Sequence, residues 1–94
     1  MSGGREVISV TLRAHTAALE DERVRATVES AARALAERQG VELVELTVDE
    51  TSLHATLVGP EVVGVGFVSE LRRSTEAWYA RRTNGATLWG TPGT

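Results

Sequence analysis

A serine and a histidine that flank a leucine, Ser52-Leu53-His54, have the residue types and spacing best suited to chemistry in this chain. On a β-strand, side chains two positions apart project from the same face, and Thr56 continues that face. An imidazole placed there is a candidate ligand for a metal ion or a contact for phosphate. The alternative is that His54 is a tolerated surface or interface residue. The second histidine, His15, lies in a predicted loop.

Arginines gather in the last third of the chain. Residues 1–61 hold six arginines against eleven acidic residues, whereas residues 62–94 hold four arginines against two acidic residues. Those four are Arg72, Arg73, Arg81 and Arg82. Arginine contacts the phosphates of nucleic acids, and the nearby Tyr79 and Trp89 are candidates for stacking on unpaired bases. The alternative is a solvated arginine face, with Trp78 in the core and with Tyr79 and Trp89 at a subunit interface.

The composition of the chain limits the classes of function that it can have. The chain has 94 residues, of which 41% are hydrophobic and 24% charged, and its net charge is −3. These values predict a single globular domain and argue against a broadly basic nucleic-acid binder. Because there is no cysteine, disulfides, thiolate catalysis and cysteine-ligated metals are excluded. Neither a signal peptide nor an apolar run of about 20 residues is present, so a cytoplasmic location without a membrane partner is expected.

The elements that must position these residues follow from hydrophobic spacing. Alternation predicts a strand over residues 6–13, and helical spacing predicts a helix over residues 19–39 that Gly40 ends. Strands over residues 41–48 and 53–58 are joined by a short polar turn, which is typical of an antiparallel hairpin. We expect Val44, Leu46 and Val48 to share the core face of the first of these two strands.

The last third is predicted to be mainly helical. Gly59-Pro60 ends the hairpin, and a helix is predicted over residues 61–82. Gly64 and Gly66 weaken its start, so that residues 62–68 also fit a strand, but the helical spacing continues beyond them. The role we expect for the two glycines is close packing of the helix on the sheet or on a partner. Residues 86–89 fit a short final strand.

This order predicts an α+β fold, a ferredoxin-like β-α-β-β-α(-β) sandwich with both helices on one face of an antiparallel sheet. Residues 1–4 are expected to be disordered, residues 5–90 to form the single domain, and residues 91–94 to be a flexible tail. The other sheet face is left open, and we expect function there. Its predicted side chains are Ser9, Thr11, Arg13, Glu45, Thr47, His54 and Thr56.

The chain resembles the IS200-type, single-tyrosine HUH transposases and their REP-associated relatives. The resemblance rests on Ser52-Leu53-His54, on the break Val58-Gly59-Pro60, on the helical Leu71-Arg72-Arg73-Ser74-Thr75 and on Leu88-Trp89. Those domains share this order: a strand, a long helix, a hairpin with a His-hydrophobic-His pair, a second helix and a Leu-Trp. What the resemblance implies is a related fold and a surface for single-stranded or hairpin DNA.

The departures bear on catalysis. In the family, two histidines and another polar side chain hold a divalent cation that polarises the scissile phosphate. Ser52 stands where the first histidine belongs, and Tyr79 precedes Leu88-Trp89, whereas the family's nucleophilic tyrosine follows its Leu-Trp. We therefore expect no catalytic residue, no bound metal and no cofactor.

These observations lead to one main hypothesis and one alternative. The main hypothesis is a catalytically inactive, transposase-like domain that acts as a nucleic-acid-binding or regulatory homodimer. Its predicted binding residues are Arg13, His54, Thr56, Arg72 and Arg73, with Tyr79 and Trp89 at an interface or stacking on bases. The alternative is a structural or regulatory protein-protein interaction module with a ferredoxin-like fold and no role in nucleic-acid binding.

Overall fold

The computed structural model describes residues 6–15 and 17–89 of the chain. The predicted disordered N-terminus (1–4) and flexible tail (91–94) lie outside these residues. The elements in chain order are β1 (Val7–Arg13), the 3-10 helix η1 (Ala17–Glu20), α1 (Glu22–Gln39), β2 (Leu43–Val48), β3 (Ser52–Val58) and α2 (Glu61–Arg82). The α+β class is confirmed.

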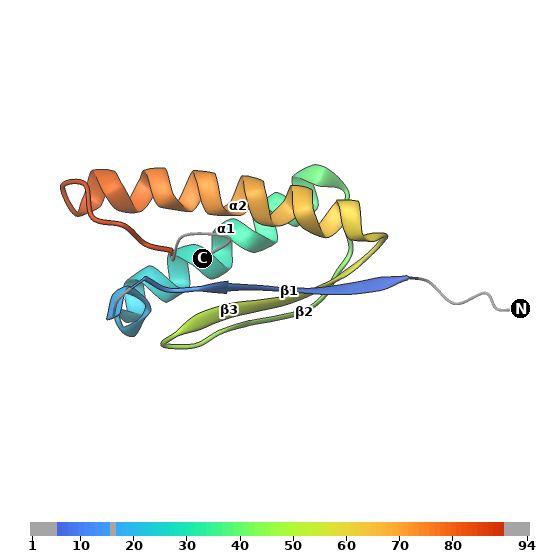
Figure 1. Cartoon of the computed structure of the whole chain (residues 1–94), viewed down its shortest axis with the longest axis horizontal. Helices are drawn as coiled ribbons and strands as arrows, with labels where there is room; N and C mark the ends of the chain where they lie inside the picture. Colours follow the sequence, from blue (N-terminus) through green and yellow to red (C-terminus); the bar gives the residue numbers. More distant parts are fainter. Residues whose placement is uncertain (1–5, 16, 90–94) are drawn as a thin grey trace, which may run out of the picture.

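The three strands form one antiparallel sheet in the order β1-β3-β2, and both helices pack on one face of it (Figure 1). The central strand β3 buries Leu53, Ala55 and Leu57 against the helices. Each lies opposite an apolar residue of β1, namely Leu12, Val10 and Ile8. Because side chains alternate along a strand, this register places the intervening polar residues of β1 and β3 on the open face.

Helix α1 begins three residues later than the periodicity predicts. Its N-cap is Asp21, whose side chain accepts a hydrogen bond from the N–H of Arg23 at 2.8 Å. The preceding residues form η1, which buries Leu19 separately. The expected stop is confirmed, because Gly40 adopts a left-handed conformation (φ 70°) and its N–H bonds to the last carbonyls of the helix. The buried stripe of α1 is Val24, Val28, Ala32, Leu35 and Ala36.

Strand β2 departs from strict alternation at Val44. Its pairing with β3 shifts register between Leu43 and Glu45, so one extra residue is accommodated there. Leu43 therefore takes the core-facing place opposite Leu57, and Val44 is 54% exposed. The prediction that Val44 shares the core face with Leu46 and Val48 is wrong at this residue.

Helix α2 spans the predicted range, and the alternative of a strand over residues 62–68 is excluded. Its glycines differ in environment. A Cβ atom built on Gly64 would lie 2.9 Å from Ile8 Cδ1, so the helix approaches β1 closely because no side chain intervenes. Around Gly66 nothing lies within 4 Å of such an atom. Gly64 packs on the sheet as expected, and Gly66 lies on the open side of the helix.

After α2 the chain returns to the end of β1. His15 N–H donates to Leu88 O at 2.8 Å, and Ala14 and Trp89 form a single antiparallel bridge. Within residues 6–15 and 17–89 there is no fourth strand, so the short final strand predicted over residues 86–89 is reduced to this bridge. No helix in the described part of the chain is long and apolar enough to cross a membrane.

Candidate functional site

His54 is held on the open sheet face by two hydroxyl groups. Thr11 lies directly opposite on β1, and its Oγ1 is 3.1 Å from His54 Nδ1. Ser52, two residues earlier on the same face of β3, places its Oγ 2.9 Å from His54 Nε2. Both ring nitrogens are thus occupied, and one is a donor and the other an acceptor when the imidazole is neutral. These contacts fix the orientation of an otherwise exposed ring.

Asp49 organises the turn next to this cluster. Its Oδ1 accepts hydrogen bonds from the N–H of Thr51 at 2.8 Å and of Ser52 at 2.9 Å, and from Thr51 Oγ1 at 3.0 Å. These hydrogen bonds hold the pKa of the Asp49 carboxyl below its ordinary value, and the bond from the Thr51 backbone has the largest effect. Asp49 is therefore a turn-capping residue, as expected for an acid beside a β-turn.

A serine hydroxyl bonded to an imidazole resembles a nucleophile and its general base, but the rest of that arrangement differs here. In a triad, a carboxylate orients the second ring nitrogen of the histidine. At His54 that nitrogen contacts Thr11 instead, while the nearby Asp49 bonds to the turn. Ser52 is also 93% buried, because its exposed fraction is 7%. The Ser52 hydroxyl is thus not an exposed nucleophile, and the cluster is a group of polar side chains linked by hydrogen bonds.

The remaining open-face residues were placed correctly from the sequence. Ser9 Oγ and Thr56 Oγ1 are 3.3 Å apart, and Arg13 lies opposite Ser52 in the register. Glu45 lies opposite Thr56 on the other side of β3. The face carries hydroxyls, one imidazole and charges of both signs, so it is not a strongly basic surface. Among residues 6–15 and 17–89, no group of three or more His, Cys, Asp or Glu side chains is placed to hold a metal ion.

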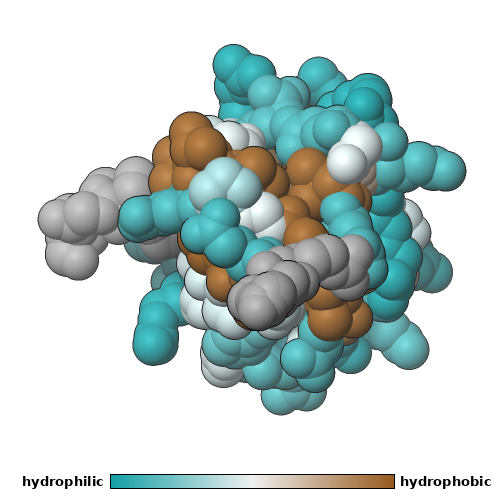
Figure 2. Space-filling model, turned by 90° about the vertical axis from the view of Figure 1, so that its right-hand side faces the viewer, coloured by the Kyte–Doolittle hydropathy of each residue, from teal (hydrophilic) through white to brown (hydrophobic). Residues whose placement is uncertain are grey.

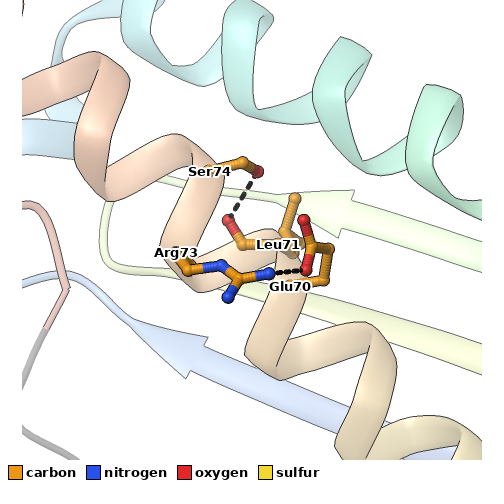
Figure 3. Close-up of polar contacts among 4 residues, drawn as sticks. All are labelled: Glu70, Leu71, Arg73 and Ser74. Carbon is orange, nitrogen blue, oxygen red and sulfur yellow. Dashed lines mark hydrogen bonds and ion pairs between the residues drawn. The ribbon is translucent and has the colours of Figure 1, made fainter.

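Arg72 and Arg73 do not join Arg13, His54 and Thr56. They lie on α2, which covers the opposite face of the sheet (Figure 1). Arg73 forms an ion pair with Glu70 one turn earlier on the same helix, and its side chain is 77% exposed (Figure 3). The five predicted binding residues therefore belong to two separate surfaces, because the sequence pattern assigned faces within each element but not between elements.

Trp89 corrects the prediction of a stacking or interface residue. It is 1% exposed, and its Nε1 donates to Thr75 Oγ1 at 2.9 Å in the core. Glu76 holds the same segment, since its carboxylate accepts the N–H of Leu88 at 2.7 Å and that of Trp89 at 3.2 Å. From the sequence alone, Glu76 is only one of the two acidic residues of the last third of the chain. The sequence does contain a signal for this role: Thr75 and Glu76 are adjacent polar residues on the inner side of the predicted helix.

Trp78 is half-buried and packs against the hydrophobic core, where one of the two interpretations of the sequence placed it. Its ring lies 5.6 Å from the guanidinium carbon of Arg82, and its centroid is 6.3 Å from that of Tyr79. It lines a groove of about 300 Å³ between α1 and α2, to which Arg38 of α1 and Ser74 of α2 also contribute. The groove combines an aromatic wall with polar and cationic groups.

The outer edge of β1 is a second feature, and hydrophobic spacing along the sequence does not reveal it. Ala14 N–H bonds to Thr51 O, and Gly59 N–H bonds to Glu6 O, so even-numbered residues direct their backbone groups toward β3. Because these directions alternate in an antiparallel pair, Val7, Ser9 and Thr11 direct theirs outward. No described strand pairs with them. A groove of about 350 Å³ runs along this edge beneath α2, where Gly64, Val65, Val68 and Ser69 line it.

Four large apolar side chains are exposed on the first halves of β1, β2 and α2. They are Val7 (61% exposed), Val44 (54%), Val62 (72%) and Val65 (58%). Figure 2 views the molecule from the right-hand side of Figure 1 and shows hydrophobic surface in several adjoining areas among the polar side chains. Val44 lies on the opposite edge of the sheet from β1, whereas Val65 lines the groove beside β1, so exposed apolar surface borders the outer edge of β1.

No protein-family model matches this chain, and no curated protein matches it at a significant level. The resemblance to HUH transposases therefore rests on the residues quoted for it above.

Proposed function

We propose that this protein is a non-catalytic protein-protein interaction module, structural or regulatory in role, with a ferredoxin-like arrangement. The observation that carries the proposal is the outer edge of β1 from Val7 to Thr11, with which no strand in residues 6–15 and 17–89 pairs, and which is bordered by a groove and by exposed valines of α2. An exposed strand edge supplies backbone hydrogen bonds to an incoming strand, and apolar neighbours supply burial. The order β1-β3-β2, with both helices on one face, supports the ferredoxin-like arrangement, in which a further strand would lie beside β1.

The test is photo-crosslinking at the edge of the groove in the cells that make this protein. A benzophenone amino acid is placed at Val65, and the control carries it at Ala77, which is also exposed on α2 but lies three turns away. We expect protein adducts from position 65 that position 77 does not give. Equal labelling at both positions, or no protein adduct at either, would contradict an interaction site at the β1 edge.

Nucleic-acid binding by an inactive HUH-like domain is the second candidate function. The observation that favours it is on the helices, where Trp78 and Arg38 line one groove and four arginines lie on the second half of α2. Aromatic and arginine side chains together contact unpaired bases and phosphates. The element order strand, helix, hairpin, helix and Leu-Trp supports the descent that this candidate assumes.

This candidate predicts salt-sensitive binding of single-stranded or hairpin DNA. Replacing both Arg72 and Arg73 by Ala removes two cationic contacts, so the affinity is expected to fall by about tenfold or more at low salt, and the salt dependence to weaken. Fluorescence anisotropy with a labelled oligonucleotide measures both quantities. The matched control is replacement of Arg23 and Arg33 of α1 by Ala, which should leave binding within about twofold. The absence of any binding at low salt would reject this candidate.

A further inference from the structure

We propose that Asn84-Gly85, in the turn that follows α2, is a site of spontaneous deamidation, and that the cap at the end of α2 controls its rate. Asn84 is the only asparagine in the chain, and a glycine follows it directly. Water is the only co-reactant, so this modification needs no enzyme. It goes beyond the proposed interaction function and is independent of it.

The turn leaves the reacting groups open to water. Asn84 and Gly85 are exposed, and so are Ala86 and Thr87 after them. Because glycine has no side chain, nothing attached to its own Cα shields its nitrogen from the side-chain carbonyl carbon of the asparagine before it. The nucleophile and the carbon that it attacks therefore belong to adjacent residues of a solvated turn.

The reaction has two steps. In the first step, the Gly85 nitrogen forms a bond to Cγ of Asn84, and the bond from Cγ to the side-chain nitrogen breaks. The side-chain nitrogen leaves as ammonia with the proton that the Gly85 nitrogen loses, and a cyclic succinimide remains. In the second step, water opens the ring at either of its carbonyl carbons, so that a carboxyl group forms and a proton returns to the Gly85 nitrogen. The products are aspartate and isoaspartate.

The cap of α2 holds the Gly85 nitrogen back from this reaction. Its N–H donates to Ala80 O at 2.7 Å, and the N–H of the C-cap residue Thr83 donates to Tyr79 O at 2.9 Å. Asn84 lies between them in the left-handed conformation (φ 63°), which is typical of the residue after a C-cap in a Schellman motif. The Gly85 nitrogen must lose its bond to Ala80 before it can give up its proton and attack.

Opening of the cap requires only the last turn of α2 to fray. Helix ends open at a much lower free energy than the core, and Arg81 and Arg82 of this turn are exposed. The rate of deamidation in the folded protein is then the rate in the open turn multiplied by the fraction of time that the cap is open. The cap therefore slows the reaction without preventing it.

The isoaspartate product does not fit the same cap. Its main chain runs through the former side chain of Asn84 and contains an additional carbon, so the spacing between Ala80 O and the Gly85 N–H changes. The turn leads to Leu88 and Trp89, whose N–H groups bond to the carboxylate of Glu76. Deamidation is therefore expected to loosen the segment that returns from α2 to β1.

Intact mass tests the site, because deamidation replaces an amino group by a hydroxyl group and changes the mass of the whole chain. The wild type is incubated at mildly alkaline pH, folded and unfolded in urea. We expect the folded protein to gain mass about three- to tenfold more slowly than the unfolded chain. The control Asn84→Gly keeps a residue suited to the left-handed position and should gain none, since Gln39 is then the only side-chain amide left.

A weaker last turn tests the control by the cap. Ala80→Gly lowers the helix propensity and keeps the carbonyl that accepts from Gly85, so deamidation of the folded protein should become about two- to fivefold faster. The matched control is Ala26→Gly, an exposed position of α1, which should leave the rate unchanged. Circular dichroism checks that the variants are folded, and Ala77→Gly, one turn earlier on α2, is used if Ala80→Gly is not.

Three results would overturn the inference: a folded wild type that gains no mass while the unfolded chain reacts, equal rates in the two states, or equal acceleration by the glycine substitutions in α1 and α2. Equal acceleration would mean that global unfolding, not fraying of α2, admits the reaction.

Hydrogen exchange tests the consequence in the isoaspartate form, separated by chromatography. The amides of Leu88 and Trp89 should exchange faster in this form than in the wild type and in Asn84→Asp, which has the charge without the longer main chain. Unchanged exchange in the isoaspartate form would overturn the loosening of this segment.

Discussion

The contact between Thr75 and Trp89 shows how one hydroxyl can hold a chain segment in the core. Both residues are buried, and the indole N–H donates to Thr75 Oγ1 at 2.9 Å. Thr75 Oγ1 in turn lies 2.6 Å from the carbonyl oxygen of Leu71, so the hydroxyl links the helix backbone to the indole. The return of the chain to β1 therefore depends on a polar contact inside an apolar layer.

Replacing Thr75 by Val is expected to destabilise the fold by about 1–3 kcal/mol, because the shape is kept while a buried indole N–H loses its acceptor. Urea unfolding followed by tryptophan fluorescence measures this change. Ser74→Ala is the matched control, since Ser74 is exposed and its hydroxyl bonds to Leu71 O of the same helix at 3.3 Å; its effect should stay within about 0.5 kcal/mol. Equal effects of the two substitutions would show that the indole bond contributes nothing.

Asp49 makes part of the stability depend on pH. Its carboxylate accepts bonds from Thr51 and Ser52, and its pKa is lowered in the folded protein relative to the unfolded chain. A carboxyl with a lowered folded pKa contributes stability above its unfolded pKa, which is about 4, and this contribution is lost as the pH falls through the folded pKa. The stabilisation should therefore be complete at pH 7 and shrink below about pH 4.

The measurement compares thermal unfolding of the wild type with that of Asp49→Asn, which keeps an acceptor oxygen but does not titrate in this range. The difference between the two midpoints is expected to be larger at pH 7 than at pH 3. A difference that does not change with pH would mean that the charge of Asp49 is not what stabilises the turn.

At the scale of the elements, the contact between α2 and β1 depends on a glycine. A Cβ atom on Gly64 would lie 2.9 Å from Ile8 Cδ1 and 3.1 Å from Val10 Cγ1, so the helix and the strand would have to separate or repack. Gly64→Ala is therefore expected to destabilise the fold by about 1–3 kcal/mol. Gly66→Ala is the matched control in the same helix turn, where free space and helix propensity predict a gain of about 0.5–1 kcal/mol.

Chemical unfolding measures the free energy of unfolding of both variants. The two changes relative to the wild type are expected to have opposite signs. If Gly64→Ala also stabilises, Ile8 moves aside at no cost and the close approach is not a constraint.

The elements themselves were predictable to different degrees. The core face of β3 and the long helices follow from apolar spacing, because burial of one face repeats at the period of each element. The bulge at Val44 and the 3-10 turn before α1 were not predictable in this way. Each of them is a one-residue or few-residue adjustment that tertiary packing selects, and hydrophobic spacing does not record it.

The sequence by itself determined the α+β class, the hairpin and the residues of the open sheet face, including His54 and Thr56. Hydrophobic periodicity is a local property, so the sequence of each strand shows which of its residues share a face. Only the tertiary structure decided which surfaces lie together. It separated Arg72 and Arg73 from His54 by the thickness of the sheet and buried Trp89 against Thr75. Among the described residues, it also left Val7 to Thr11 without a strand on their outer side. These outcomes depend on how distant elements pack, because a side chain's exposure is set by neighbours that its own sequence window does not contain.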